Sequence, residues 1–182
     1  MKKGKNNIYF KLAGISSIIL AVIALIGWIL FIIKNESWNN MILIISSLSW
    51  ILIFFAFFTI YKKLKFIYSQ NYFIVLIFFT VIELIVNLSG NTNNAIFISS
   101  LILTFIVGLM LLDKRLKKKF GNNIRIIAIF FISYPILLII LTLPLFVSEL
   151  LIIQSTLILT ILTVILYIYL TIFFLKDVKK LN

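Results

Sequence analysis

Six apolar stretches alternate with short polar ones along the chain. The apolar stretches cover residues 12–33, 41–60, 72–88, 95–112, 124–147 and 150–175. Each is close to the ~20 residues with which a helix crosses a hydrocarbon core of ~30 Å, and each is nearly free of charge. The pattern therefore predicts an all-α polytopic integral membrane protein, a bundle of six transmembrane helices. The polar stretches are too short for a separate soluble domain, so we expect a single transmembrane domain over residues 1–182.

The basic residues predict how this bundle is oriented. Short cytoplasmic loops of membrane proteins retain lysine and arginine, whereas translocated loops lack them. Lysines stand before the first apolar stretch, in the second and fourth polar connections and after the last stretch, whereas the other connections hold only Lys34. Both termini are therefore expected in the cytoplasm. We interpret the net charge of +12 as a topology signal and do not expect nucleic acid as a partner.

The composition agrees with a membrane protein and limits the kinds of catalytic or metal site that the chain can form. Hydrophobic residues make up 63% of the 182 residues and charged ones 12%, and the mean hydropathy is +1.22. The fifteen lysines against two arginines, with abundant Ile, Phe and Asn, suggest an AT-rich prokaryotic genome and a cell-membrane location. Because the chain has no histidine and no cysteine, we predict no metal, cofactor or catalytic residues and no enzymatic activity.

One carboxyl lies in the middle of an apolar stretch. An ionised Glu83 there would cost several kcal/mol, so it must be paired, hydrated or protonated. Thr80, Glu83 and Asn87 lie at positions i, i+3 and i+7 and share one helix face. Gln154 near the start of the last stretch, with the hydroxyls of Thr156, Thr160, Thr163, Tyr167, Ser46, Ser47 and Ser49, offers partners. The pattern indicates either a small polar site in the outer half of the bundle, centred on Glu83, Asn87 and Gln154, or an interhelical hydrogen bond that only fixes packing.

Small residues form a stripe on the first predicted helix. Ala13, Ser17 and Ala21 follow one another at four-residue spacing, and Ser100, Thr104 and Gly108 repeat the spacing on the fourth. Such stripes let helix backbones approach closely. They indicate packing within the bundle or docking onto another membrane subunit.

The most basic connection, residues 113–123, also has two interpretations. Lys114, Arg115, Lys117, Lys118 and Lys119 serve topology alone, or they contact anionic lipid headgroups or a cytoplasmic partner.

In length, helix count and its first-helix stripe, Ala13-x-x-x-Ser17-x-x-x-Ala21, the chain resembles the substrate-binding membrane subunits of energy-coupling-factor vitamin transporters. Those proteins use an Ala-x-x-x-Ala stripe to meet a transmembrane coupling subunit. The resemblance implies a vitamin site near the outer face and a partner at the stripe. Ser17 takes the place of one alanine, and the outer connections of this chain are short.

We therefore expect a non-enzymatic multi-pass protein that is a transport-associated or accessory subunit of a membrane complex. The alternatives are a small membrane protein of immunity or envelope-maintenance type and the energy-coupling-factor type of substrate-binding subunit. The lipid bilayer is the expected partner, with another membrane subunit as a further one.

Overall fold

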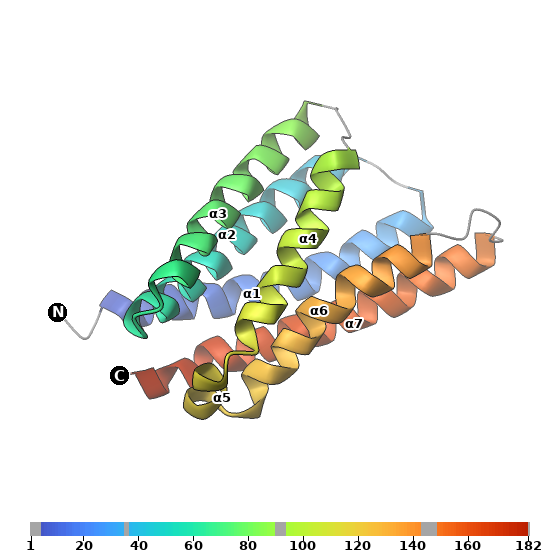
Figure 1. The fold of residues 1–182 in the computed structure, drawn as a ribbon. Helices are drawn as coiled ribbons and strands as arrows, with labels where there is room; N and C mark the ends of the chain where they lie inside the picture. The colour runs from blue at the N-terminus through green and yellow to red at the C-terminus, as the bar shows by residue number, and fades with distance from the viewer. Residues whose placement is uncertain (1–4, 35–36, 90–93, 143–148, 182) are drawn as a thin grey trace.

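Helices make up nearly all of the computed structural model, which describes residues 5–34, 37–89, 94–142 and 149–181 (Figure 1). Within these residues the fold is all-α, as predicted. The elements are α1 (Lys5–Ile32), α2 (Asn39–Lys63), α3 (Ile67–Leu88), α4 (Asn94–Leu111), α5 (Lys114–Phe120), α6 (Asn122–Thr142), α7 (Glu149–Leu175) and the short 3₁₀-helix η1 (Asp177–Leu181).

Several helices continue beyond the apolar stretches that predicted them. α1 begins at Lys5, α2 ends at Lys63 and α3 begins at Ile67, so only Leu64–Phe66 connects α2 to α3. Hydropathy locates only the apolar part of a helix, whereas the backbone hydrogen bonds that define it run on through polar residues. The end of the fifth stretch, residues 143–147, lies outside the described residues.

The basic connection between the fourth and fifth apolar stretches is not a loop. Asp113 caps α5 by accepting a hydrogen bond from the backbone N–H of Arg115 at 2.8 Å. α5 ends at Gly121, whose φ of 77° is easily adopted by glycine. Leu116 and Phe120 are buried, and α5 packs on α6 and η1. This connection folds as a helix because its two apolar residues, at positions i and i+4, give the seven-residue helix a face to bury.

Five helices among the described residues are long and apolar enough to cross a membrane. These spans are Ile8–Ile32, Asn39–Lys63, Ser69–Leu88, Asn122–Ile140 and Ile153–Lys179, and α4 contributes the shorter apolar segment Ile98–Leu111. Large apolar side chains such as Ile18, Val75 and Phe78 point outward, while the hydroxyls of Ser16 and Ser17 are buried. An apolar exterior around buried polar groups is the distribution that a lipid environment favours.

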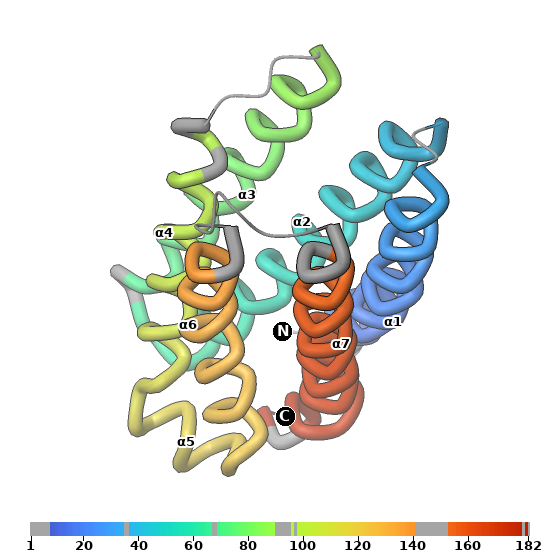
Figure 2. The backbone as a smooth tube through the Cα atoms, turned by 90° about the vertical axis from the view of Figure 1, so that its right-hand side faces the viewer, coloured from blue at the N-terminus to red at the C-terminus, as the bar shows by residue number. Residues whose placement is uncertain are grey.

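The six long helices form a ring. α1 packs on α2 and α7, α2 on α3, α4 on α6, and α6 on α7, while α3 and α4 make the least contact of the neighbouring pairs (Figure 2). α1 starts, and η1 ends, at the same end of the ring, which also carries the α2–α3 turn and α5 (Figure 1). We call this the basic end, and the opposite one the far end.

The basic half of the ring is filled by aromatic side chains. Phe57 stacks on Phe73 with ring centroids 5.6 Å apart and on Phe173 at 5.9 Å. Tyr61 meets Phe73 at 5.0 Å, and Phe120 of α5 meets Phe173 at 5.1 Å. These five rings are essentially inaccessible to solvent. The interior of the ring is therefore closed at its basic half.

Candidate functional site

A cavity of about 310 Å³ lies inside the ring, beyond the aromatic core toward the far end. Five helices line it, and α1 is the one long helix that contributes no lining residue among those described. The lining residues are Leu43, Ser46, Ser47, Trp50 and Phe54 of α2, Leu76, Phe79, Thr80 and Glu83 of α3, Ser100, Leu103 and Thr104 of α4, Phe131 and Tyr134 of α6, and Thr163, Leu166 and Tyr167 of α7.

Glu83 supplies the one ionisable carboxyl of this lining. It lies five residues before the end of α3, roughly 8 Å along the helix axis from Leu88. Within the part of the chain that the structure describes, neither a hydrogen bond nor an ion pair reaches its carboxyl, and no lysine or arginine lines the cavity. The carboxyl is half-buried and faces a polar space large enough for water or a small solute.

Four of the eight lining hydroxyls donate their proton to a carbonyl of their own helix. Thr80 donates to the carbonyl of Leu76 at 2.8 Å. Thr104 and Thr163 donate in the same way to Ser100 and Leu159, each at 2.7 Å. A hydroxyl that donates backward keeps its oxygen lone pairs for other partners. These threonines therefore present hydrogen-bond acceptors to the cavity.

Aromatic rings form the deeper wall. Trp50 stacks on Phe54 with centroids 5.3 Å apart and meets Phe131 and Tyr167 edge-on, each at 5.9 Å. These contacts hold the rings of α2, α6 and α7 in fixed positions around the cavity.

The structure brings together only part of the polar site that the sequence indicated. Thr80 and Glu83 line the cavity, and so do Ser46, Ser47, Thr163 and Tyr167. Asn87 lies one turn beyond Glu83, and Gln154 is exposed near the start of α7; neither lines the cavity. The cavity is thus centred deeper in the ring than the expected outer site.

Trp50 and Tyr134 are cavity residues that the pattern did not single out. Each occurs in a long apolar stretch, where an aromatic residue most often faces the core or the lipid. The sequence carries no further signal for them, because the cavity wall exists only once α2, α6 and α7 are packed together.

The two small-residue stripes have different surroundings. Ala13 and Ser17 are fully buried within the chain, and the Ser17 hydroxyl donates to the Ala13 carbonyl at 2.9 Å, while Ala21 is half-buried. On α4, by contrast, Ser100 and Thr104 line the cavity, and Gly108 lies directly against the backbone of α6.

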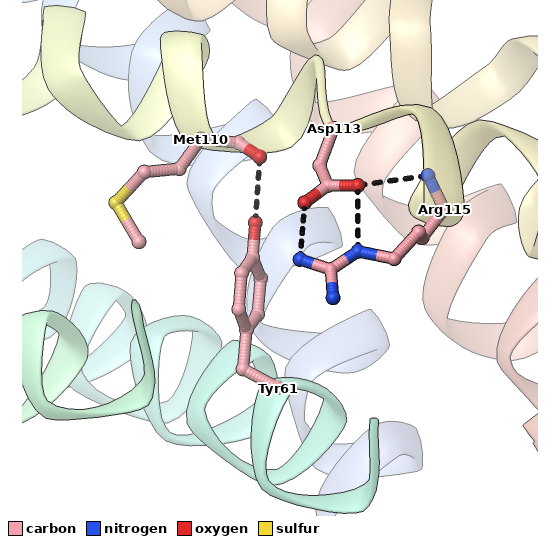
Figure 3. A network of polar contacts seen from close by, with 4 residues as sticks. All are labelled: Tyr61, Met110, Asp113 and Arg115. Atoms are coloured by element: carbon pink, nitrogen blue, oxygen red, sulfur yellow. Dashed lines mark hydrogen bonds and ion pairs between the residues drawn. The ribbon is translucent and has the colours of Figure 1, made fainter. Parts of the chain in front are cut away.

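A network of polar contacts links the α2–α3 region to the α4–α5 junction at the basic end (Figure 3). The Tyr61 hydroxyl donates to the Met110 carbonyl at 2.9 Å. Arg115 donates to the carboxylate of Asp113 through Nη2 at 2.9 Å and Nε at 3.2 Å, and its guanidinium lies 3.7 Å above the ring of Phe66. The side-chain hydrogen bond from Arg115 lowers the pKa of Asp113 below its usual range, although partial burial opposes it.

The five basic residues predicted as a lipid or partner contact are all exposed. Lys114, Arg115, Lys117, Lys118 and Lys119 surround α5, whose buried Leu116 and Phe120 fix it to the bundle. They therefore form one compact positive surface on an ordered helix at the basic end.

Comparison with protein-family models, with curated proteins and with solved structures finds no match for this chain. Among the described residues there is also no group of three His, Cys, Asp or Glu side chains that could hold a metal ion. Neither a relative nor a metal site among the described residues therefore indicates a function, and the cavity is the feature that does.

Proposed function

We propose that the chain is a non-enzymatic multi-pass protein of a prokaryotic cell membrane that binds a small solute in the Glu83 cavity, as a transport-associated or accessory subunit of a membrane complex. The observation that carries the proposal is the cavity. A volume of about 310 Å³, lined by several hydroxyls and one unpaired carboxyl, lies within the range of small-molecule sites. A carboxyl that served packing alone would be paired instead of being left at a void.

The position of the cavity supports binding from one side. The packed rings of Phe57, Tyr61 and Phe73 lie between the cavity and the basic end, so a solute reaches Glu83 from the far end. A closed inner half and an accessible outer half are what a solute-binding subunit requires. A continuously open pore would need polar or hydrated space along its whole length.

The proposed topology has six crossings, with both termini and α5 in the cytoplasm. α4 has 18 residues and rises about 27 Å, close to the ~30 Å of a hydrocarbon core. By sequence, all but Lys34 of the 17 basic residues belong to the segments at the basic end. In this arrangement the basic residues of α5 lie at the level of the inner headgroups and contact anionic lipid.

Single cysteines test the topology and the cavity together, because the chain contains none of its own. Ser37→Cys and Thr80→Cys should react with a membrane-impermeant thiol reagent added outside intact cells. Lys118→Cys should react only after the cells are opened, and Val75→Cys on the lipid-facing side of α3 is the matched unreactive control.

Labelling of position 118 from outside would refute the orientation, and protection of position 80 where position 37 reacts would refute an accessible cavity. Glu83→Gln separates the functional classes. A solute-binding subunit should lose its solute-dependent activity with this variant. Protection of cells against a membrane-active peptide, unchanged by Glu83→Gln, would instead assign the chain to the immunity type.

A further inference from the structure

We infer that the cavity selects a small organic ammonium ion that carries N–H donors. This inference rests on the proposed solute-binding function and adds the chemical class of the solute. Its basis is that three independent features of the lining favour the same kind of partner: the charge, the hydrogen-bonding direction and the rings.

The only full charge that an acidic or basic side chain of the described lining can carry is negative. Glu83 is the one ionisable carboxyl of the lining, and no basic side chain lines the cavity to neutralise it. By sequence, the connection between α1 and α2 and the first residue of α7 add Lys34, Glu36 and Glu149, a net charge of −1, while the cations gather at the opposite end. A cation that enters from the far end supplies the counter-charge to Glu83 that no lining residue provides.

Four of the eight lining hydroxyls can only accept hydrogen bonds from a solute. The hydroxyls of Thr80, Thr104 and Thr163 donate to carbonyls of their own helices. The Ser46 hydroxyl donates in the same way to the carbonyl of Leu43 at 3.0 Å. Their oxygens therefore accept, as does the carboxylate. A ligand that donates hydrogen bonds matches these groups, whereas an anion or an acceptor-only solute would leave them unsatisfied.

The rings complete the match. Trp50 and its neighbours Phe54, Phe131 and Tyr167 form one wall of the cavity, and a cation bound among such rings is attracted by their electron-rich faces. The aromatic wall offers no ligand to a bare metal ion, and it suits the carbon frame of an organic cation.

Three probes of similar size separate charge, N–H donors and shape. tert-Butylammonium at about pH 7.5 has both charge and N–H groups, tetramethylammonium has charge alone, and tert-butanol is a neutral molecule with the same carbon frame as the first. Binding is measured on the full chain in lipid nanodiscs by the fluorescence of Trp50, in a background carrying Trp28→Phe and Trp38→Phe.

The expected order of affinity is tert-butylammonium, then tetramethylammonium, then tert-butanol, with at least a tenfold difference between the first and the last, about 1.4 kcal/mol. Glu83→Gln should remove this difference. Glu83→Asp, which keeps the charge one methylene further back, should retain part of it. The comparison of probes on the Glu83 chain needs no cavity variant, so it holds even where a Glu83 variant fails to fold.

Equal binding of tert-butylammonium and tert-butanol would overturn the cation inference and leave the proposed solute-binding function intact. Binding of tetramethylammonium as tight as that of tert-butylammonium would overturn the role of the acceptors. Absence of binding by all three probes would overturn the inference outright. The cysteine labelling at position 80 would then decide separately whether the cavity is accessible, and so whether the proposed function also fails.

Discussion

Replacing Gly108 by alanine should weaken the bundle, because α4 lies directly against the backbone of α6 there. A Cβ at this position would lie 2.6 Å from Cγ1 of Ile132, and 2.9 Å from both the carbonyl oxygen of Ala128 and the backbone nitrogen of Ile132. Ordinary contacts begin near 3.4 Å, so the two helices would have to separate by about half an ångström. Backbone atoms cannot rotate out of the way as the tip of a side chain can.

The magnitude follows from two opposing terms. Overpacking of a close contact costs about 1–3 kcal/mol. Alanine is also a better helix former than glycine, by up to ~1 kcal/mol, which partly hides the clash. Gly27→Ala is the matched control, because a Cβ at Gly27 would meet no heavy atom within 4 Å. The difference between the two variants therefore isolates the steric term, about 1–3 kcal/mol.

The free energy of unfolding is measured in mixed micelles with increasing fractions of denaturing detergent, followed by tryptophan fluorescence. Gly14→Ala should fall between the two variants, since its Cβ would meet only the Leu175 side chain, at 2.7 Å, which can change rotamer. If Gly108→Ala unfolds at the same detergent fraction as Gly27→Ala, the close approach of α4 and α6 is wrong.

Two further predictions concern the basic end. Tyr61→Phe removes the hydroxyl that donates to Met110 at 2.9 Å and should lower the free energy of unfolding by about 0.5–1.5 kcal/mol, whereas Tyr9→Phe at an exposed ring should change it little; equal effects would contradict a specific bond. The lowered pKa of Asp113 means that its carboxylate stabilises the folded state above the unfolded pKa of about 3.9, and that this contribution is lost as the pH falls through the lower folded value. Stability measured against pH should therefore lose part of its acid-side slope in Asp113→Asn, and an unchanged slope would show that the pair with Arg115 contributes nothing.

The cavity could be anticipated only in part, and particular residues show why. Glu83 and Thr80 were predictable because a carboxyl in an apolar stretch is costly, and because i, i+3 spacing places both on one face. The sequence relates Gln154 to them only through its distance along its own helix. That distance gives the level of the residue along the helix axis, but it does not say whether its side chain points into the ring or outward. Trp50 was not anticipated, since its place in the wall depends on contacts with Phe131 of α6 and Tyr167 of α7.

The sequence alone determined the class of the protein. Long apolar stretches separated by short polar ones favour helices, because a helix satisfies its own backbone hydrogen bonds in lipid, and the all-α fold confirms the predicted helices. The six-crossing count and the cytoplasmic termini remain predictions. Tertiary structure alone decided that the basic connection folds as α5, that Ala13 and Ser17 are covered by other helices, and that Ser100 and Thr104 face the same space as Glu83. Helix periodicity places residues on a face, whereas the partner of that face is chosen by the packing of all helices together.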